Sequence, residues 1–140
     1  MIISKNLPSI DDIKKNLSPL FQEKELQLAL LFGSIVRGGT HSYSDIDLAF
    51  LYDTPIDVIS LTTEVIKLLH TDRVDVIDLS RATPLLRFSV VRHGRLLYER
   101  SPGLFNTFSS LAFRRYVDTK KLRAAGQRAV ESFLQQKGLI

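Results

Sequence analysis

Cysteine and tryptophan are both absent from this 140-residue sequence. Without cysteine the chain has no disulfides and no thiolate ligands, so a metal site would have to use oxygen or nitrogen donors. No apolar run approaches the roughly 18 residues needed to cross a bilayer. The first residues also lack the cationic start and apolar stretch of a signal peptide. These absences predict a cytoplasmic protein that does not use a membrane.

Hydrophobic residues make up 44% of the chain and charged residues 24%, which is the balance of a globular protein. At this length we expect a single domain over residues 1–140. The net charge of +4 is uneven, because residues 99–140 hold eight basic and three acidic residues, against eleven and twelve in the first 98. A basic C-terminal region fits an acidic partner, nucleic acid included, and fits a solvated helix face equally well.

Short apolar segments predict four strands. Residues 26–32 (LQLALLF) and 46–52 (IDLAFLY) are too short for stable helices and end at turn-forming residues. Residues 73–79 (RVDVIDL) are β-branched and alternate in the manner of a strand. Residues 95–98 (RLLY) are expected to form an edge strand.

Capping residues and prolines mark the helices. Four helix starts are expected, at Ser9, Thr54-Pro55, Thr83-Pro84 and Ser101-Pro102. The last helical region fills most of the remaining chain, with a break expected near Asp118 or Gly126. Residues 35–44 hold at best a short helical turn followed by a loop rich in Gly, Thr and Ser.

The alternation of helices and strands predicts an α/β or α+β domain. We expect one small sheet that helices cover on one face. Its core lies at about residues 25–100, followed by a helical C-terminal region at about residues 101–140.

Two acidic residues open the second strand. In Asp45-Ile46-Asp47 the carboxylates share one face of the strand and Ile46 lies on the other, because successive side chains alternate. Two carboxylates held a few ångströms apart repel each other, and a divalent cation relieves that repulsion. Mg²⁺ binds one or two protein carboxylates together with water and phosphate oxygens. The pair is therefore a candidate magnesium site.

A third acid is expected on the neighbouring strand. Asp75 occupies a position where a core strand would place an apolar side chain, and a buried acid without a partner is costly. A metal ion shared with Asp47 would provide that partner. Asp78 falls on the opposite face and nearer the strand end, so Asp75 is preferred and Asp78 is the alternative.

Gly33-Ser34, at the end of the first strand, is a candidate phosphate cradle. Gly33 lets the backbone approach a phosphate, and Ser34 offers an N–H and a hydroxyl at the start of a helical turn. An Asp-x-Asp alone is mostly structural. Three acids beside a phosphate cradle, however, indicate two-metal phosphoryl or nucleotidyl transfer, with Asp75 taking the proton of the acceptor hydroxyl.

The segment LFGSIVRGGTHSYSDIDLAF resembles the signature of the nucleotidyltransferase superfamily that includes DNA polymerase β, within its small MNT or MntA-like branch. The resemblance continues through RVDVIDLSRATPLLRFSVVRHGRLLYERSP and covers roughly residues 25–102. Val36 is a departure, because alanine is more usual there. The residues that match the signature are Gly33, Ser34, Arg37, Gly38, Ser44, Asp45 and Asp47.

The resemblance implies a minimal nucleotidyltransferase fold, with a small mixed sheet covered by helices. Proteins of this branch are antitoxins of bacterial and archaeal two-gene modules. Each binds a helical HEPN ribonuclease toxin in a hetero-oligomeric complex and transfers AMP from ATP to a tyrosine of the toxin. For this chain it implies two Mg²⁺ ions, ATP as the substrate, a HEPN toxin as the partner and no direct binding of nucleic acid.

Each role carries over to a matching position. By this resemblance Asp45, Asp47 and Asp75 would bind the metal ions, and Asp75 would also act as the base. Gly33 and Ser34 would bind the phosphates. Arg37 would either brace the loop or meet a phosphate.

Two other functions stay open. The same chemistry could act on a small molecule or an RNA end, or the protein could neutralise its toxin by contact alone. Relatives that modify antibiotics or RNA ends carry a further domain for the acceptor, and 140 residues leave no room for one, so an acceptor supplied in trans is favoured. The basic C-terminal region is a candidate docking surface, with a core-packing helix as the alternative.

Overall fold

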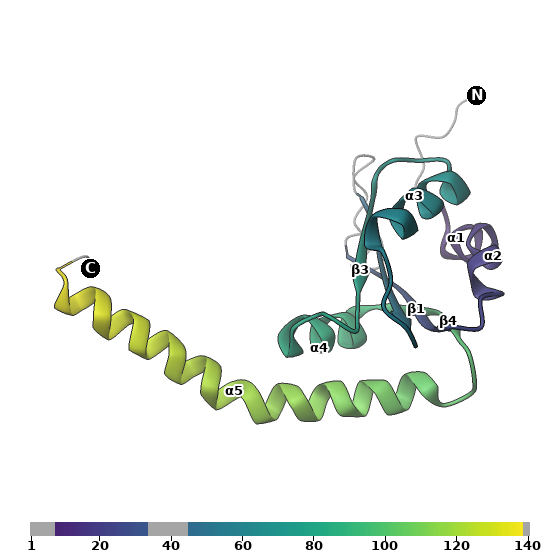
Figure 1. The fold of residues 1–140 in the computed structure, drawn as a ribbon. Coiled ribbons are helices and arrows are strands. Elements are labelled where there is room, and N and C mark those ends of the chain that lie inside the picture. Colours follow the sequence, from purple (N-terminus) through teal and green to yellow (C-terminus); the bar gives the residue numbers. More distant parts are fainter. Residues whose placement is uncertain (1–7, 34–44, 139–140) are drawn as a thin grey trace.

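The computed structural model describes residues 8–33 and 45–138. Within these ranges the chain forms five helices and four strands (Figure 1). The helices are α1 (Ile10–Asn16), α2 (Ser18–Phe21), α3 (Val58–Leu69), α4 (Pro84–His93) and α5 (Leu104–Gln136). The strands are β1 (Leu26–Phe32), β2 (Ile46–Tyr52), β3 (Val74–Asp78) and β4 (Arg95–Glu99). All four expected strands are present, and the bounds of β1 and β2 are the expected ones. The short turn expected within residues 35–44 lies outside the described residues.

The four strands form one mixed sheet in the order β3-β2-β1-β4. The central strand β1 is antiparallel to both β2 and β4, whereas β2 and β3 are parallel. A parallel pair needs a crossover connection, and α3 supplies it between β2 and β3. The sheet therefore carries β4 at one edge, as expected, and β3 at the other.

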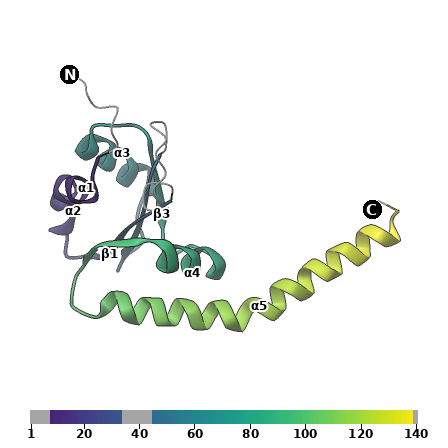
Figure 2. The same ribbon diagram turned by 180° about the vertical axis from the view of Figure 1, so that it is seen from behind.

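Helices cover both faces of the sheet, so the expectation of a single covered face was wrong (Figures 1 and 2). On one face Leu48 and Phe50 belong to a core that includes residues of α1, α2 and α3. On the other face Leu30 and Ala49 pack with α4 and the start of α5. The physical reason lies in β1, where residues 28–31 all have no exposed surface: side chains on both faces need cover.

Helix starts follow the capping chemistry with two corrections, and one of them is that α5 begins at Leu104 after Gly103, without a side-chain cap, rather than at Ser101-Pro102. Ser9 and Thr83 accept hydrogen bonds from backbone N–H groups two or three residues into α1 and α4, as expected. The crossover helix α3, however, is capped by Asp57 rather than Thr54. The Asp57 carboxylate accepts from the N–H groups of Ile59 and Ser60, and a charged acceptor binds such groups more strongly than a hydroxyl does.

The C-terminal helix α5 runs without a break for 33 residues, so the interruption expected near Asp118 or Gly126 does not occur. Its first half packs on α4, where Phe88 stacks on Tyr116 with ring centroids 4.5 Å apart. Its second half extends away from the sheet (Figures 1 and 2). None of the helices in the described part of the chain is long and apolar enough to cross a membrane.

Candidate active site

The Asp-x-Asp pair lies where the strand period places it, at the start of β2. Ile46 is 2% exposed and belongs to the core beneath α1, α2 and α3. Because side chains alternate along a strand, Asp45 and Asp47 face the other side of the sheet, the side that α4 and α5 cover further along. Asp47 is half-buried, and the Asp45 side chain is 48% exposed.

Asp75 lies beside Asp47. The two residues are partners in the parallel register of β2 and β3, one position after the Ile46 and Val74 pair. Registered neighbours in a sheet project to the same face from strands about 4.8 Å apart. The fold therefore brings a carboxylate from each of two strands to one face, beside the end of β1, where Phe32 is the antiparallel partner of Asp47.

The burial argument that favoured Asp75 over Asp78 was wrong in its premise. Asp75 is exposed, whereas Asp78 is only 8% exposed. Asp78 pairs with Phe50 and so lies on the opposite face from Asp47 and Asp75. Its Oδ1 accepts hydrogen bonds from the Ser80 N–H at 3.0 Å and the Ser80 hydroxyl at 2.7 Å. The buried acid thus shapes the turn after β3, and Asp75 qualifies for the site by its face and register.

Gly33 closes β1 directly against Asp47. Its φ of +87° lies in the region that residues with a side chain rarely adopt. A Cβ added at this position would also overlap the Asp47 carboxylate. A glycine is therefore required here for its backbone conformation and for the space beside the acid. Ser34 and Arg37, the other residues expected to meet phosphate, lie outside the described residues.

A cation that the sequence reasoning missed lies among the acids. Arg73 places its Nε 3.7 Å from the Asp45 Oδ1, and its carbonyl accepts from the Ile46 N–H at 2.8 Å. Both side chains of the ion pair are 48% exposed, so the pair contributes at most about 1 kcal/mol and is readily exchanged. The signal was present in the sequence, because Arg73 precedes Asp75 by two positions and so shares its face.

The carboxylates suit a hard divalent cation. Mg²⁺ takes oxygen ligands and keeps positions for water and substrate phosphate, and this face offers carboxylates of the right kind beside Gly33. In the part of the chain that the structure describes, no three acidic or imidazole side chains already cluster tightly enough to hold a metal ion. The oxygen donors nevertheless fit the ligand chemistry of the ion.

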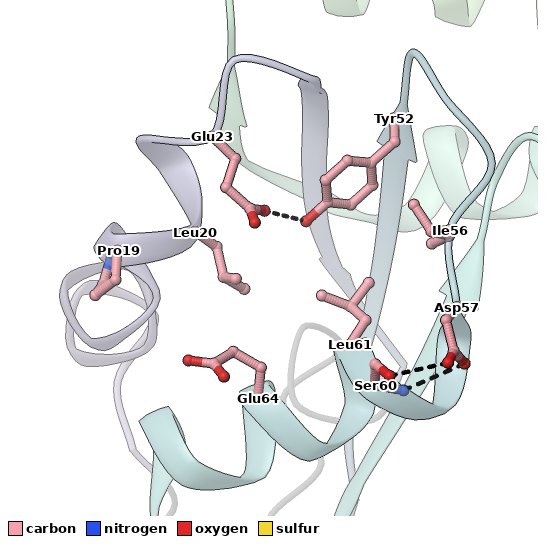
Figure 3. A pocket seen from close by; sticks show the side chains of 9 residues that line it. All are labelled: Pro19, Leu20, Glu23, Tyr52, Ile56, Asp57, Ser60, Leu61 and Glu64. Atoms are coloured by element: carbon pink, nitrogen blue, oxygen red, sulfur yellow. Dashed lines mark hydrogen bonds between the residues drawn. The ribbon is translucent and has the colours of Figure 1, made fainter.

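A cavity lies on the opposite face of the sheet from these carboxylates, between α2, α3 and the end of β2 (Figure 3). This cavity of about 380 Å³ has an apolar wall of Leu20 and Leu61 and carries Glu23, Asp57 and Glu64. The Tyr52 hydroxyl donates to Glu23 at 2.7 Å, and burial, followed by this bond, raises the pKa of the phenol. Two of its three acids already have structural partners, since Glu23 accepts from Tyr52 and Asp57 caps α3, so the cavity does not offer three carboxylates to a metal-bound nucleotide.

A mixed sheet with helices on both faces, with acids near the starts of β2 and β3 and a glycine at the end of β1, places the protein in the class of small α/β domains with a candidate phosphoryl-transfer site. Within that class the sequence matches the family described as "Polymerase beta, Nucleotidyltransferase" over residues 15–103. The chain belongs to this family, as its signature predicted.

Two relatives within reach of this sequence are both protein adenylyltransferases. The chain is 26% identical over 147 residues to the protein adenylyltransferase MntA of Aphanizomenon flos-aquae, a match that covers 95% of this chain and 97% of the relative. It is 39% identical over 77 residues to the protein adenylyltransferase MntA of Shewanella oneidensis, covering 53% of this chain and 55% of the relative.

Solved structures agree with this placement. A crystal structure of a toxin–antitoxin pair with AMP-PNP contains a chain that superposes with a TM-score of 0.70 at 29% identity, covering 91% of this chain and 99% of that one. A structure of tri-AMPylated Shewanella oneidensis HEPN toxin in complex with MNT antitoxin gives a TM-score of 0.67 at 25% identity, covering 90% and 99%. The expected minimal nucleotidyltransferase fold is confirmed.

Proposed function

We propose that this protein is an antitoxin that transfers AMP from ATP to a tyrosine hydroxyl of a HEPN ribonuclease toxin and so neutralises it. The observation that carries the proposal is the match to a protein adenylyltransferase over 95% of this chain and 97% of the relative. Structures of antitoxin chains with AMP-PNP and with an AMPylated toxin support the nucleotide and the partner. The cytoplasm, where such a toxin would act, is the proposed compartment.

Three acids and the end of β1 would perform the transfer. Asp45 and Asp47 would hold metal ions at the α-phosphate, and Gly33 and Ser34 would receive the outer phosphates through backbone N–H groups. The tyrosine oxygen would form a bond to the α-phosphorus while the bond to the bridging oxygen breaks and pyrophosphate leaves. Bound Mg²⁺ would supply neutralisation of the negative charge on these phosphates. Asp75 would complete the metal site and accept the proton of the incoming tyrosine hydroxyl.

Arg73 fits the same scheme. Its guanidinium lies beside Asp45, where it balances the acidic charge. Because the pair is weak and exposed, a metal ion could take Asp45 and leave Arg73 to face the triphosphate. Arg37 would brace the loop after β1 or meet a phosphate.

The test is label transfer from α-labelled ATP to the purified toxin in the presence of Mg²⁺. We expect label on the toxin with the native sequence, and transfer at least about a hundredfold slower with Asp45→Asn/Asp47→Asn, since loss of even a ligand's supporting partner costs roughly 10–100-fold. A matched control is Asp11→Asn/Asp12→Asn, which changes two exposed acids of α1 on the far side of the sheet.

The outcomes separate the three functions. Label on a small molecule or an RNA end, with none on the toxin, would replace the proposed substrate. A double variant that no longer transfers AMP yet still silences the toxin would show that contact alone is sufficient. Loss of neutralisation with retained binding supports the enzyme.

A further inference from the structure

The second half of α5 carries apolar side chains that nothing in the described chain covers. Every residue from 124 to 133 is exposed. The large apolar side chains of Leu122, Val130 and Phe133 are 72%, 57% and 55% exposed. We call residues 122–136 the distal segment.

The exposed residues of the distal segment form one stripe. Leu122, Val130 and Phe133, together with the small residues Gly126 and Ala129, follow helical spacings of three, four, seven and eight and so share a face. Small residues within such a stripe let another helix approach closely. An amphipathic stripe without a partner in its own chain is the pattern of an interface.

The charge near the stripe is positive, which favours a partner with an acidic surface. Within the distal segment Arg123 and Arg128 outnumber the one acid, Glu131, and α5 as a whole holds six basic residues against two acidic ones. Two copies of this chain paired along α5 would bring the same cations against each other, which disfavours self-association. An apolar surface with an acidic rim complements both the stripe and its charge.

The position of α5 also suits a protein substrate. The start of α5 packs on the same face of the sheet to which Asp47 and Asp75 project. A protein held on the distal segment would therefore be connected through α5 to the face that carries the carboxylates, with the second half of the helix extending away from the sheet (Figure 1). The match to an antitoxin chain from a toxin–antitoxin structure covers 91% of this chain, more than residues 1–103 make up, so it includes part of α5.

We propose that the distal segment is the docking surface for the toxin, which binds it through an apolar, helical surface rimmed by acidic side chains. This inference rests on the proposed function, because it takes the acceptor to be that toxin. The distal segment holds the substrate, and the carboxylates of the sheet act on the tyrosine presented to them.

The experiment compares three exposed apolar positions on helices. Val130→Asp and, separately, Phe133→Asp should raise the KM for the toxin at least about tenfold, the effect of losing an interface residue worth 1.4 kcal/mol or more, and leave kcat at saturating toxin unchanged. Ile59→Asp is the matched control, because Ile59 is 79% exposed on α3 over the other face. It should leave both constants unchanged. Circular dichroism checks that all three variants remain folded.

Binding of the toxin, measured by calorimetry on the same variants, separates this inference from the proposed function. Weakened binding in both distal variants supports the docking surface, even if the native sequence transfers no AMP and the proposed function fails. Transfer by the native sequence with an unchanged KM in both variants overturns the docking surface and leaves the function intact. A native chain that dimerises alone, and that Val130→Asp makes monomeric, would assign the stripe to a second copy and also overturn it.

Discussion

Gly33 is needed both for its positive φ and for the space beside Asp47, and a second glycine, Gly103, allows the two effects to be measured separately. Gly33 and Gly103 have nearly the same φ, +87° and +89°. A Cβ at Gly33 would overlap Asp47, whereas one at Gly103 would meet no atom within 4 Å. Alanine at either position costs about 1–2 kcal/mol of backbone strain.

We therefore expect Gly33→Ala and Gly103→Ala to lower the free energy of unfolding, measured in urea, by similar backbone contributions. Only Gly33→Ala should also slow AMP transfer, by at least about tenfold, because it displaces a carboxylate proposed to hold a metal ion. Equal transfer rates in the two variants would mean that the space beside Asp47 has no part in the chemistry.

The two acids of β3 should separate activity from stability. Asp75 is exposed on the face of Asp47, whereas Asp78 is buried on the other face and accepts two hydrogen bonds from Ser80. Asp78→Ala should lower the free energy of unfolding by about 1–3 kcal/mol, and Asp75→Ala by less than about 0.5 kcal/mol. In transfer assays Asp75→Asn should be the more severe change relative to Asp78→Asn. The reverse order would make Asp78 the third acid.

At the level of elements, the two halves of α5 should differ in amide exchange. Phe113 and Tyr116 contact Phe88 of α4, and Ala112 is 3% exposed, whereas residues 124–133 are all exposed. A helical segment without packing is marginally stable in water. Hydrogen exchange of the chain alone should therefore be slow over residues 105–116 and fast over 124–133. Uniform protection along α5 would show that the second half is stabilised by something other than packing.

The strands were the predictable elements. β1 and β2 begin and end where their apolar runs do, because turn-forming residues bound both runs. The cover on both faces was missed, although four consecutive apolar residues at positions 28–31 already imply it. The unbroken course of α5 through Gly126 was also missed, since a glycine costs only about 1 kcal/mol within a helix and the flanking residues favour the helix.

The candidate site was likewise predictable only in part. That Asp45 and Asp47 share a face follows from the period of a strand alone. That Asp75 stands level with Asp47 depends on how far the crossover through α3 shifts β3 along β2, and a shift of one residue would have turned Asp75 to the opposite face. Local sequence carries no measure of that shift, and the exposure of Asp75 likewise depends on how the elements assemble.

At the scale of the whole molecule, shape and charge are both asymmetric. A helix of 33 residues is about 50 Å long, and the second half of α5 extends away from the sheet (Figure 2). The C-terminal region, residues 99–140, carries the positive charge, because the first 98 residues hold slightly more acids than bases. A long basic helix raises the rate at which an acidic partner is captured, and salt would weaken that attraction.

The change from packed to exposed residues within α5 therefore marks a boundary in the fold. Everything proposed to act on the nucleotide lies before residue 122, and the segment proposed to bind the acceptor lies after it. Recombination at this boundary between related toxin–antitoxin modules would produce chimeras that keep the same nucleotidyl transfer and bind a different toxin. Such pairs could thus diversify by exchanging the distal segment while the nucleotidyltransferase site stays the same.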